Sequence, residues 1–395
     1  MNQKNINSFQ SLMEYLFGHP ARKLFTILAI IVLIPVTYCG ICVASEYDTS
    51  RGGFMGALAT VLSQLTGTPV PPPVASHIAA GDGGYVYYTV DGSTWTASQI
   101  APAAVNFRSV VRTGKNYIVA GGAAASCEIY FSADGIAWTK STITGTCSDT
   151  VNDLAARGSE VIGVGGMTTY ASNPIELTSS NDGETWNVAP LTLALSDLLR
   201  IEFDGTYYLA ATGTFSISVY RKLPGGAYAA APINPLSGAK NHILGDLYRI
   251  PATSRVVAAG SRSVFTPPAG SDYSINSSTT WTANATAIFG GNINFFPRAL
   301  AYGNGRLIAA GDSCMMDYSD DSTTSLTWNY NGTMTGCPAG VTWRGAVWDG
   351  NRFIAVGQTG GASPVGILAV SPTGNPNDWT IQTSGTPSLY GIAVK

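Results

Sequence analysis

The sequence predicts an all-β protein, a seven-bladed β-propeller preceded by an N-terminal transmembrane helix. Only 11% of the 395 residues are charged and 45 are glycine, a composition typical of many short strands joined by tight turns. A unit that ends in an aromatic residue recurs from residue 77 onward, and an uncharged apolar run occupies residues 24–45. The formal net charge of −3 provides no broad basic surface, which argues against nucleic acid as a partner.

The apolar run predicts a membrane anchor. About 20 apolar residues suffice to span a bilayer, and residues 24–45 reach this length without a charge. Basic residues precede the run and Glu46 follows it, so the positive-inside rule places residues 1–23 in the cytoplasm and the remainder outside. We expect a single-pass protein of a bacterial inner membrane with its propeller in the periplasm. Secretion after signal cleavage at Val43-Ala44-Ser45 is the alternative.

The chain divides into five regions by these criteria. Residues 1–23 form a cytoplasmic amphipathic segment and residues 24–45 the transmembrane anchor. Residues 46–67 carry apolar side chains at helical spacing, which predicts a juxtamembrane amphipathic helix that lies on the membrane, on a partner helix or against the propeller. Residues 68–76 form a Pro-rich linker, and residues 77–395 form the propeller.

The repeat consists of a strand, a turn, a strand that ends in small residues, and a hairpin that ends in Trp. The clearest hairpins pair Asp91 with Trp95, Asp134 with Trp138, and Asp182 with Trp186. Weaker copies end at Tyr228, Trp281, Trp328 and Trp379, so that successive aromatics lie 42 to 53 residues apart. Each unit is long enough for four short strands, the size of one propeller blade.

The two ends of the repeat array complete each other. Residues 77–97 supply only three strands, and residues 389–394 resemble a first strand that nothing follows. Pairing these segments completes a seventh blade and closes the ring, which leaves no open sheet edge between the ends.

The stretch Ser-Ser-Asn-Asp-Gly-Glu-Thr-Trp at 179–186 resembles the Asp-box (BNR) repeat of sialidases, sortilin-like receptors and photosystem II assembly-factor propellers. The resemblance covers residues 77–395 and implies the fold more than a function. We interpret Asp91, Asp134 and Asp182 as structural, because a short Asp side chain caps its own turn.

Four cysteines in the propeller occur twice in the same arrangement. Cys127 and Cys314 each lie in a loop between the second and third strands, and Cys147 and Cys337 lie in the next loop between blades. Both loops belong to one face, so we predict disulfides Cys127–Cys147 and Cys314–Cys337 and an oxidising compartment. A metal site is the alternative, although no Cys-x-x-Cys pair or nearby His supports it.

Five arginines form the candidate binding site. Counting 13 residues back from the glycine that ends the second strand gives Arg108, Arg200, Arg298 and Arg344, and Arg249 aligns by its own context 11 residues before Gly260. Asn152 and Tyr390 occupy this place in the other two blades. We expect these side chains to ring the central funnel and bind a carboxylate or phosphate. Local pairing with Glu202, Asp149, Asp153 or Asp246 is the alternative.

The resemblance points to two functions. The stretch Tyr248-Arg249-Ile250-Pro251 is similar to a sialidase motif whose Arg holds the substrate carboxylate, but its place in the array differs and no nucleophilic Tyr–Glu pair is identifiable. Photosystem assembly propellers imply a non-catalytic module with an Arg-rich patch for a membrane-protein partner. We therefore expect a binding or scaffold propeller of a membrane complex, without catalytic residues, cofactor or metal. An acidic-glycan lectin or sialidase-like glycosidase is the alternative.

Overall fold

The computed structural model describes most of the propeller region. It covers residues 72–395 except 124–125, 167–173, 192–197, 213–218, 230–241, 252, 254, 263–272, 277–280, 284–287, 292–295, 321–325, 330–331 and 384–386. The predicted cytoplasmic segment, anchor, juxtamembrane helix and the first residues of the linker lie outside the described residues. Among the residues that are described, no helix is long and apolar enough to cross a membrane.

The described strands form seven antiparallel sheets, one of which gains an extra parallel strand. The first sheet joins β27 (Leu389–Val394), β1 (His77–Gly81), β2 (Tyr85–Thr89) and β3 (Thr96–Gln99). The second contains β4 (Asn106–Arg112), β5 (Tyr117–Ala123), β6 (Ser126–Ser132) and β7 (Thr139–Lys140). The third contains β9 (Val151–Arg157), β10 (Glu160–Gly165), β11 (Ile175–Ser179), β12 (Thr185–Pro190) and the added β8 (Thr142–Thr144).

The remaining four sheets follow in chain order. The fourth contains β13 (Leu198–Phe203), β14 (Tyr208–Thr212) and β15 (Val219–Lys222). The fifth contains β16 (His242–Ile250), β17 (Arg255–Arg262), β18 (Tyr273–Asn276) and β19 (Trp281–Ala283). The sixth contains β20 (Pro297–Gly303), β21 (Arg306–Gly311) and β22 (Met316–Ser319), with short 3-10 turns at Ile288–Gly291 and Asp312–Cys314. The seventh contains β23 (Thr342–Trp348), β24 (Phe353–Gln358), β25 (Gly366–Ser371) and β26 (Thr380–Thr383).

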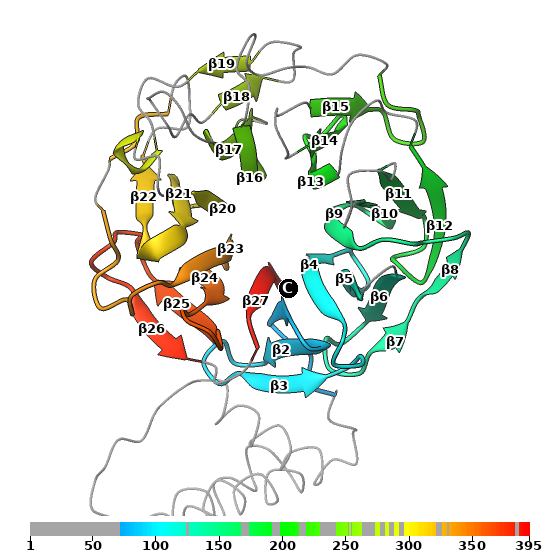
Figure 1. The fold of residues 1–395 in the computed structure, drawn as a ribbon, viewed down its shortest axis with the longest axis horizontal. Helices are drawn as coiled ribbons and strands as arrows, with labels where there is room; N and C mark the ends of the chain where they lie inside the picture. Colours follow the sequence, from blue (N-terminus) through cyan, green and yellow to red (C-terminus); the bar gives the residue numbers. More distant parts are fainter. Residues whose placement is uncertain are drawn as a thin grey trace, which may run out of the picture. The chain divides into compact units, whose positions relative to one another are not determined.

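The sheets are arranged in a ring (Figure 1), and residues of the innermost strands, Asp153 and Asp246 among them, line a central channel. The first strand of each sheet in spatial order, namely β27, β4, β9, β13, β16, β20 and β23, lies nearest the centre, and these strands contact one another in a closed cycle. The all-β propeller that the sequence predicts is therefore confirmed.

Pairing of the two ends closes the ring. β27 pairs antiparallel with β1, with Ala393 opposite Ile78. The C-terminal segment thus supplies the innermost strand of the first sheet, as the sequence predicts. Because this strand packs against both neighbouring sheets, it removes the open edge that an unclosed array would present.

Apolar side chains fill the spaces between sheets. The second strand of each sheet is almost completely buried and rich in Ala, Val and Ile, as in the stretch Tyr117–Ala120 of β5. The larger side chain of Trp186, on the outer strand β12, fills the outer part of one such space and is 1% exposed. Small residues inside and aromatic residues outside match the widening of a blade from the channel to the rim.

The hairpin turns explain the recurrent Asp. Asp91 Oδ1 accepts the backbone N–H groups of Ser93 and Thr94, each at 2.8 Å. Asp134 Oδ1 accepts those of Ile136 and Ala137 at 2.8 and 2.9 Å in the same way.

The third copy of the turn differs from the prediction. The side chain that accepts the turn N–H, that of Thr185 at 3.0 Å, belongs to Asn181 and not to Asp182. Asp182 instead adopts a left-handed conformation with φ of 58°. This copy has one more residue between its Ser and its Gly, so the capping position moves to Asn181.

Both disulfides are confirmed. The Cα atoms are 5.6 Å apart for Cys127–Cys147 and 6.0 Å for Cys314–Cys337, within the range that a disulfide spans. Cys127 lies at the start of the third strand β6, and not in the loop before it as predicted, whereas Cys314 lies in the 3-10 turn between β21 and β22. Each is bridged to the loop that enters the next sheet.

The contribution of each disulfide to stability depends on the length of the loop that it closes. Replacing Cys127 and Cys147 together by Ser should lower the free energy of unfolding by about 3 kcal/mol, because the bridge closes a loop with a sequence separation of 20. Guanidinium denaturation of the oxidised protein would measure this change. Dithiothreitol reduces both bridges in the parent protein and should produce about twice this loss there. In the double variant, where only Cys314–Cys337 remains, it should produce a loss of about 3 kcal/mol. An unchanged midpoint in the double variant would contradict this account.

Candidate functional site

A bulge near the start of each innermost strand organises the mouth of the channel. The register of each innermost strand against its neighbour skips one residue there. The skipped residues are Tyr390, Arg108, Asn152, Leu199, Gly245, Arg298 and Arg344, in order around the ring. A bulged residue has no partner in the ladder, which re-aims its side chain. Three of the five predicted arginines, with Asn152 and Tyr390, therefore share one structural position.

Arg200 lies one residue beyond this position. Opposite the bulge, the second strand carries Gly in the other six sheets, but Thr212 occupies this place in the fourth sheet. Counting back from Gly213 therefore selects Arg200 instead of Leu199. The Arg200 side chain nevertheless lines the same cavity as the bulged residues.

Arg249 does not belong to the ring, and its prediction is wrong in this respect. Gly245 is the bulged residue of β16, and Arg249 lies four residues farther along the strand. Its Nη2 lies 3.2 Å from the point where a Cβ on Gly205 would stand, in the β13–β14 hairpin at the opposite end of the channel. The sequence count fails because the β16–β17 hairpin is two residues longer than the others, so that 15 residues separate Gly245 from Gly260.

The bulged side chains enclose a cavity of about 110 Å³ at the mouth. Its lining consists of Arg108, Asn152, Leu199, Arg200, Arg298, Arg344 and Tyr390. This volume is several times the ≈30 Å³ share of one water molecule in the liquid, so a carboxylate fits with attendant water. The residues converge from six consecutive positions of the ring and not from one loop.

The arginines of the mouth differ in how they are neutralised. Arg298 forms a bidentate ion pair with Asp312, at 2.5 and 3.0 Å. Arg344 donates to Gln358 Oε1 at 3.1 Å, and its guanidinium stacks 4.8 Å from the centre of the Tyr390 ring. Local pairing thus accounts for one of these arginines but not for all.

Arg108 has a weaker local partner. Its Nη1 lies 3.4 Å from Asn152 Oδ1, and the Asn152 amide donates in turn to Leu198 O at 2.9 Å. Among the described residues, neither Arg108 nor Arg344 forms an ion pair with a carboxylate. The mouth therefore carries cationic groups that a bound anion can neutralise.

Burial shifts the pKa values of ionisable side chains at the mouth. Burial lowers the pKa of Arg344, and the charge of Arg298 acts in the same direction against the attraction of Tyr390. Burial also raises the pKa of Asp82, against the hydrogen bond that its Oδ2 accepts from the Tyr390 hydroxyl at 3.2 Å and against the more distant charges of Arg344 and Arg108. Both shifts reflect the cost of holding charge away from water, which an incoming carboxylate would offset for the arginines.

A belt of polar side chains lines the channel below the mouth. Asp153 Oδ2 accepts the backbone N–H of Ile201 at 3.0 Å, and Asp246 Oδ2 accepts that of Leu300 at 2.7 Å. Ser109 Oγ accepts the N–H of Leu154 at 3.2 Å in the equivalent contact. Each side chain caps the channel-facing edge of the next innermost strand, so this belt has a structural role.

Arg200 joins the belt to the mouth. Its Nε lies 3.6 Å from Asp246 Oδ1. Burial raises the pKa of Asp246 to about 7 against the attraction of Arg200. Burial, followed by the charges of Asp153 and Asp246, raises the pKa of Glu202 well above its usual range. The sequence predicted these acids as possible partners of the arginines. Nothing in the sequence indicated that Asp153 and Asp246 accept backbone N–H groups of the next sheet.

The chemistry of this arrangement is that of a binding site for an anion. The arginines present planar N–H donors to the cavity from several sheets. The acids below them accept hydrogen bonds from backbone N–H groups. Within the described part of the chain, no group of three or more His, Cys, Asp or Glu is placed to hold a metal ion.

Solved structures resemble this fold. YCF48 from Cyanidioschyzon merolae matches with a TM-score of 0.50 and 13% identity, over 71% of this chain and 86% of that one. The GH74 xyloglucanase from Xanthomonas campestris matches with a TM-score of 0.50 and 15% identity, over 78% of this chain and 46% of that one. YCF48 bound to a D1 peptide matches with a TM-score of 0.49, 17% identity and coverage of 70% and 81%.

These similarities define the class of protein. No protein-family model matches the chain, and no curated protein sequence matches it either. Identities this low show the fold alone, which is that of a β-propeller, and the chain spans less than half the length of the xyloglucanase. The function must therefore be argued from the site.

The raised pKa of Asp246 predicts a stability that depends on pH. An Asp in an unfolded chain titrates near 3.9, so between about pH 4 and pH 7 the folded protein holds the proton that the unfolded chain has lost. Stability should therefore fall as the pH rises through this window. Asp246→Asn should flatten the slope by up to about 1.4 kcal/mol per pH unit, as measured by denaturation at pH 5, 6 and 7.

Asp134→Asn is the matched control for this prediction. Burial would raise the pKa of Asp134, but the N–H groups of Ile136 and Ala137 outweigh it and hold the pKa below its usual range. Stability from Asp134 is present above about pH 4 and lost below it, so this variant should leave the slope between pH 5 and 7 unchanged. A parent protein whose stability rises over this range would contradict the assignment to Asp246.

Proposed function

We propose that this chain is a membrane-anchored, seven-bladed propeller that binds a protein partner outside the cytoplasm, as a subunit or assembly factor of a larger membrane complex. The observation that carries the proposal is the mouth of the channel. There Arg108 and Arg344 face a carboxylate-sized cavity, and among the described residues neither is paired with an acid. A carboxylate presented by the partner would complete this arrangement.

The location follows from two further features. The uncharged run 24–45 supplies a single-pass anchor, and the two disulfides suit an oxidising compartment such as the bacterial periplasm. A propeller tethered in this way meets partners that are themselves held at the membrane, which raises their effective concentration.

The partner should be recovered from detergent-solubilised membranes through a tag on the C-terminus. β27 begins at the mouth and ends at the opposite face, so a tag after Lys395 leaves the mouth accessible. Arg108→Ala/Arg344→Ala should reduce the recovery of the partner at least tenfold, since two charge-assisted contacts are lost. Quantitative mass spectrometry of the eluates measures this change.

Two single variants serve as controls. Arg157 lies at the other end of β9, pairs with Glu160 at 3.3 Å and keeps an exposed side chain, so Arg157→Ala should retain the partner. Arg249→Ala should also retain it, because Arg249 does not line the mouth. Equal loss in all three variants would exclude the mouth as the contact surface, and absence of any stoichiometric partner would exclude the scaffold.

An acidic glycan is the second candidate ligand, as bound by a lectin or a sialidase-like glycosidase. The same cationic cavity favours it, because sugar carboxylates and partner carboxylates present the same group to arginine. Titration with sialyllactose separates the two: saturable binding that requires Arg108 and Arg344, without a protein partner, would favour the glycan. Release of free sialic acid would show catalysis as well.

The anchor has its own test. The protein should remain in the membrane pellet after an alkaline carbonate wash, and peptide mapping should still find residues 24–45 in it. A soluble form that begins near residue 46 would instead show signal-peptide cleavage and secretion.

A further inference from the structure

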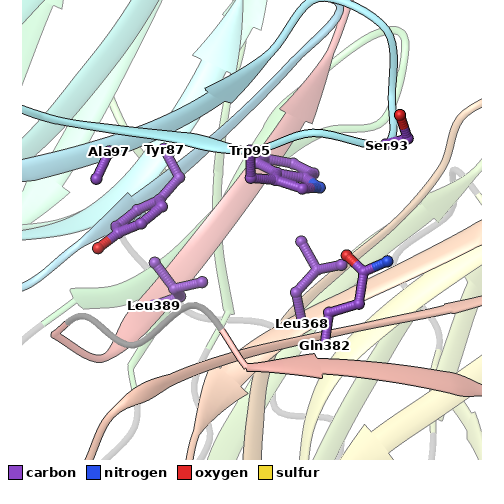
Figure 2. Close-up of a pocket in the computed structure, with 7 residues that line it drawn as sticks. All are labelled: Tyr87, Ser93, Trp95, Ala97, Leu368, Gln382 and Leu389. Carbon is purple, nitrogen blue, oxygen red and sulfur yellow. The ribbon is translucent and has the colours of Figure 1, made fainter.

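A second cavity, of about 220 Å³, lies where the first and seventh sheets meet (Figure 2). It is lined by Tyr87, Ser93, Trp95, Ala97, Leu368, Gln382 and Leu389. These residues come from the first sheet and from β25 and β26 of the seventh. None of them lines the arginine mouth, so the two cavities are separate.

The cavity has an apolar floor and a polar edge. Leu368 and Leu389 form the floor together with the ring of Tyr87, whose hydroxyl lies at the end of the cavity away from Ser93 and Gln382 (Figure 2); the three residues are only 4%, 1% and 2% exposed. Ser93 and Gln382 stand exposed at one edge, and the nitrogen of the Trp95 indole lies at the end of its ring nearer to them (Figure 2). No charged side chain lines the cavity, so its chemistry suits an uncharged ligand.

The indole N–H of Trp95 is placed differently from its counterparts. Trp138 and Trp186 donate this hydrogen to the carbonyl of their own turn glycine, at 3.2 and 2.9 Å. In the first sheet, the corresponding carbonyl of Gly92 accepts from Arg352 instead. No described residue accepts a hydrogen bond from the Trp95 indole, so this donor is available at the polar edge of the cavity.

Neighbouring contacts hold the Trp95 turn in place. Arg352, which reaches Gly92 from the seventh sheet, donates to Asp349 at 3.1 Å, and His77 lies 3.2 Å from the same carboxylate. The His77 ring also lies 6.1 Å from the Trp95 ring, centre to centre. A wall that is fixed before binding loses little conformational freedom when a ligand arrives.

The cavity lies beside the outer edge of β3. β3 is the last strand of its sheet, so half of its peptide groups point away from β2 with no strand beyond them among the described residues. Trp95 and Ala97, two residues apart, both line the cavity, as alternate residues of an extended segment do. The equivalent outer edge in the third sheet accepts β8, which pairs parallel with β12.

We propose that the cavity and the edge of β3 together bind an extended segment of a protein partner, which carries a large uncharged apolar side chain. The segment pairs with β3 as an added strand, and its apolar side chain enters the cavity over Leu368 and Leu389. Trp95 Nε1, Ser93 and Gln382 bond to the peptide group next to that side chain. This site goes beyond the proposed function and does not depend on the arginine mouth.

A neutral sugar fits this cavity less well than such a segment. A pyranose carries hydroxyl groups around its whole rim, and those over Leu368 and Leu389 would lose water without gaining a partner. An apolar side chain with one adjacent peptide group matches an apolar floor with one polar edge. The uncharged lining likewise disfavours a charged side chain.

The test uses the full chain in lipid nanodiscs, labelled with 5-fluorotryptophan. The chain contains eight Trp residues, and the signal that disappears in Trp95→Phe identifies Trp95. The probe is a capped heptapeptide of alternating threonine and leucine. It should shift the Trp95 signal saturably, and replacing its central leucine by serine should weaken binding at least tenfold, as should N-methylation of alternate amides.

Variants on the outer strands connect the response to the cavity. Ala97→Glu places a charge on the exposed wall of the cavity and should weaken binding at least tenfold, whereas Thr139→Glu, on the exposed outer strand β7, should leave it within twofold. Gln382→Ala should weaken binding about fivefold, the scale of one hydrogen bond. Arg108→Ala/Arg344→Ala should bind the peptide normally, which separates this site from the mouth.

Each contrary result overturns the proposal in a defined way. A Trp95 shift with cellobiose but not with the peptide would assign the cavity to a neutral sugar. A shift that grows with protein concentration and vanishes in Ala97→Glu would assign it to a second copy of this chain. No shift with the peptide at millimolar concentration, or equal binding by Ala97→Glu, would rule out a peptide site.

Discussion

The structure depends on how the innermost strands find hydrogen-bond partners for the backbone N–H groups that face the channel. Each of these strands has a neighbour on one side only, so its other N–H groups face the channel without a ladder partner. Side chains of the preceding sheet supply the acceptors: Asp153 for Ile201, Asp246 for Leu300, and the Tyr248 hydroxyl for Tyr302 at 3.0 Å. An unmet buried N–H costs about 1–3 kcal/mol, so these bonds help to hold successive sheets together.

The side chains that accept these N–H groups also determine the distribution of charge in the channel. Capping by Asp brings carboxylates into a confined channel, where burial, and after it the neighbouring acids, raise the pKa of Asp246 and Glu202. Asp246 there pairs with Arg200. The bulge just above turns Arg108, Arg298 and Arg344 toward the mouth. The mouth is therefore more cationic than the channel below it, where the acids lie. The proposed binding of an anion at the face of the ring would follow from this distribution of charge.

Sequence reasoning succeeded where chemistry is local and repeats. The strand–turn pattern, the Asp91 and Asp134 turns, the two disulfides and the pairing of residues 389–394 with the first sheet all follow from short stretches of chain. It failed where the residue from which positions are counted is substituted, and where the length of a hairpin differs from that of the other sheets. Arg200 was displaced by one residue because Thr212 replaces the usual glycine, and Arg249 by four because its hairpin is longer. The peripheral cavity gave no signal, since the residues around it come from sequence positions 87–97 and 368–389.

The sequence by itself determined the class of fold, its closure and its oxidised cross-links, because each depends on turn chemistry, alternating burial and spacing along the chain. Only the tertiary structure decided which arginines share the mouth, since a bulge is defined by hydrogen bonds to the neighbouring strand. It also decided the pKa of Asp246 and the orientation of the Trp95 indole. Those properties depend on side chains that are distant in the sequence. Folding brings Arg200 close to Asp246 and Arg352 close to the Gly92 carbonyl.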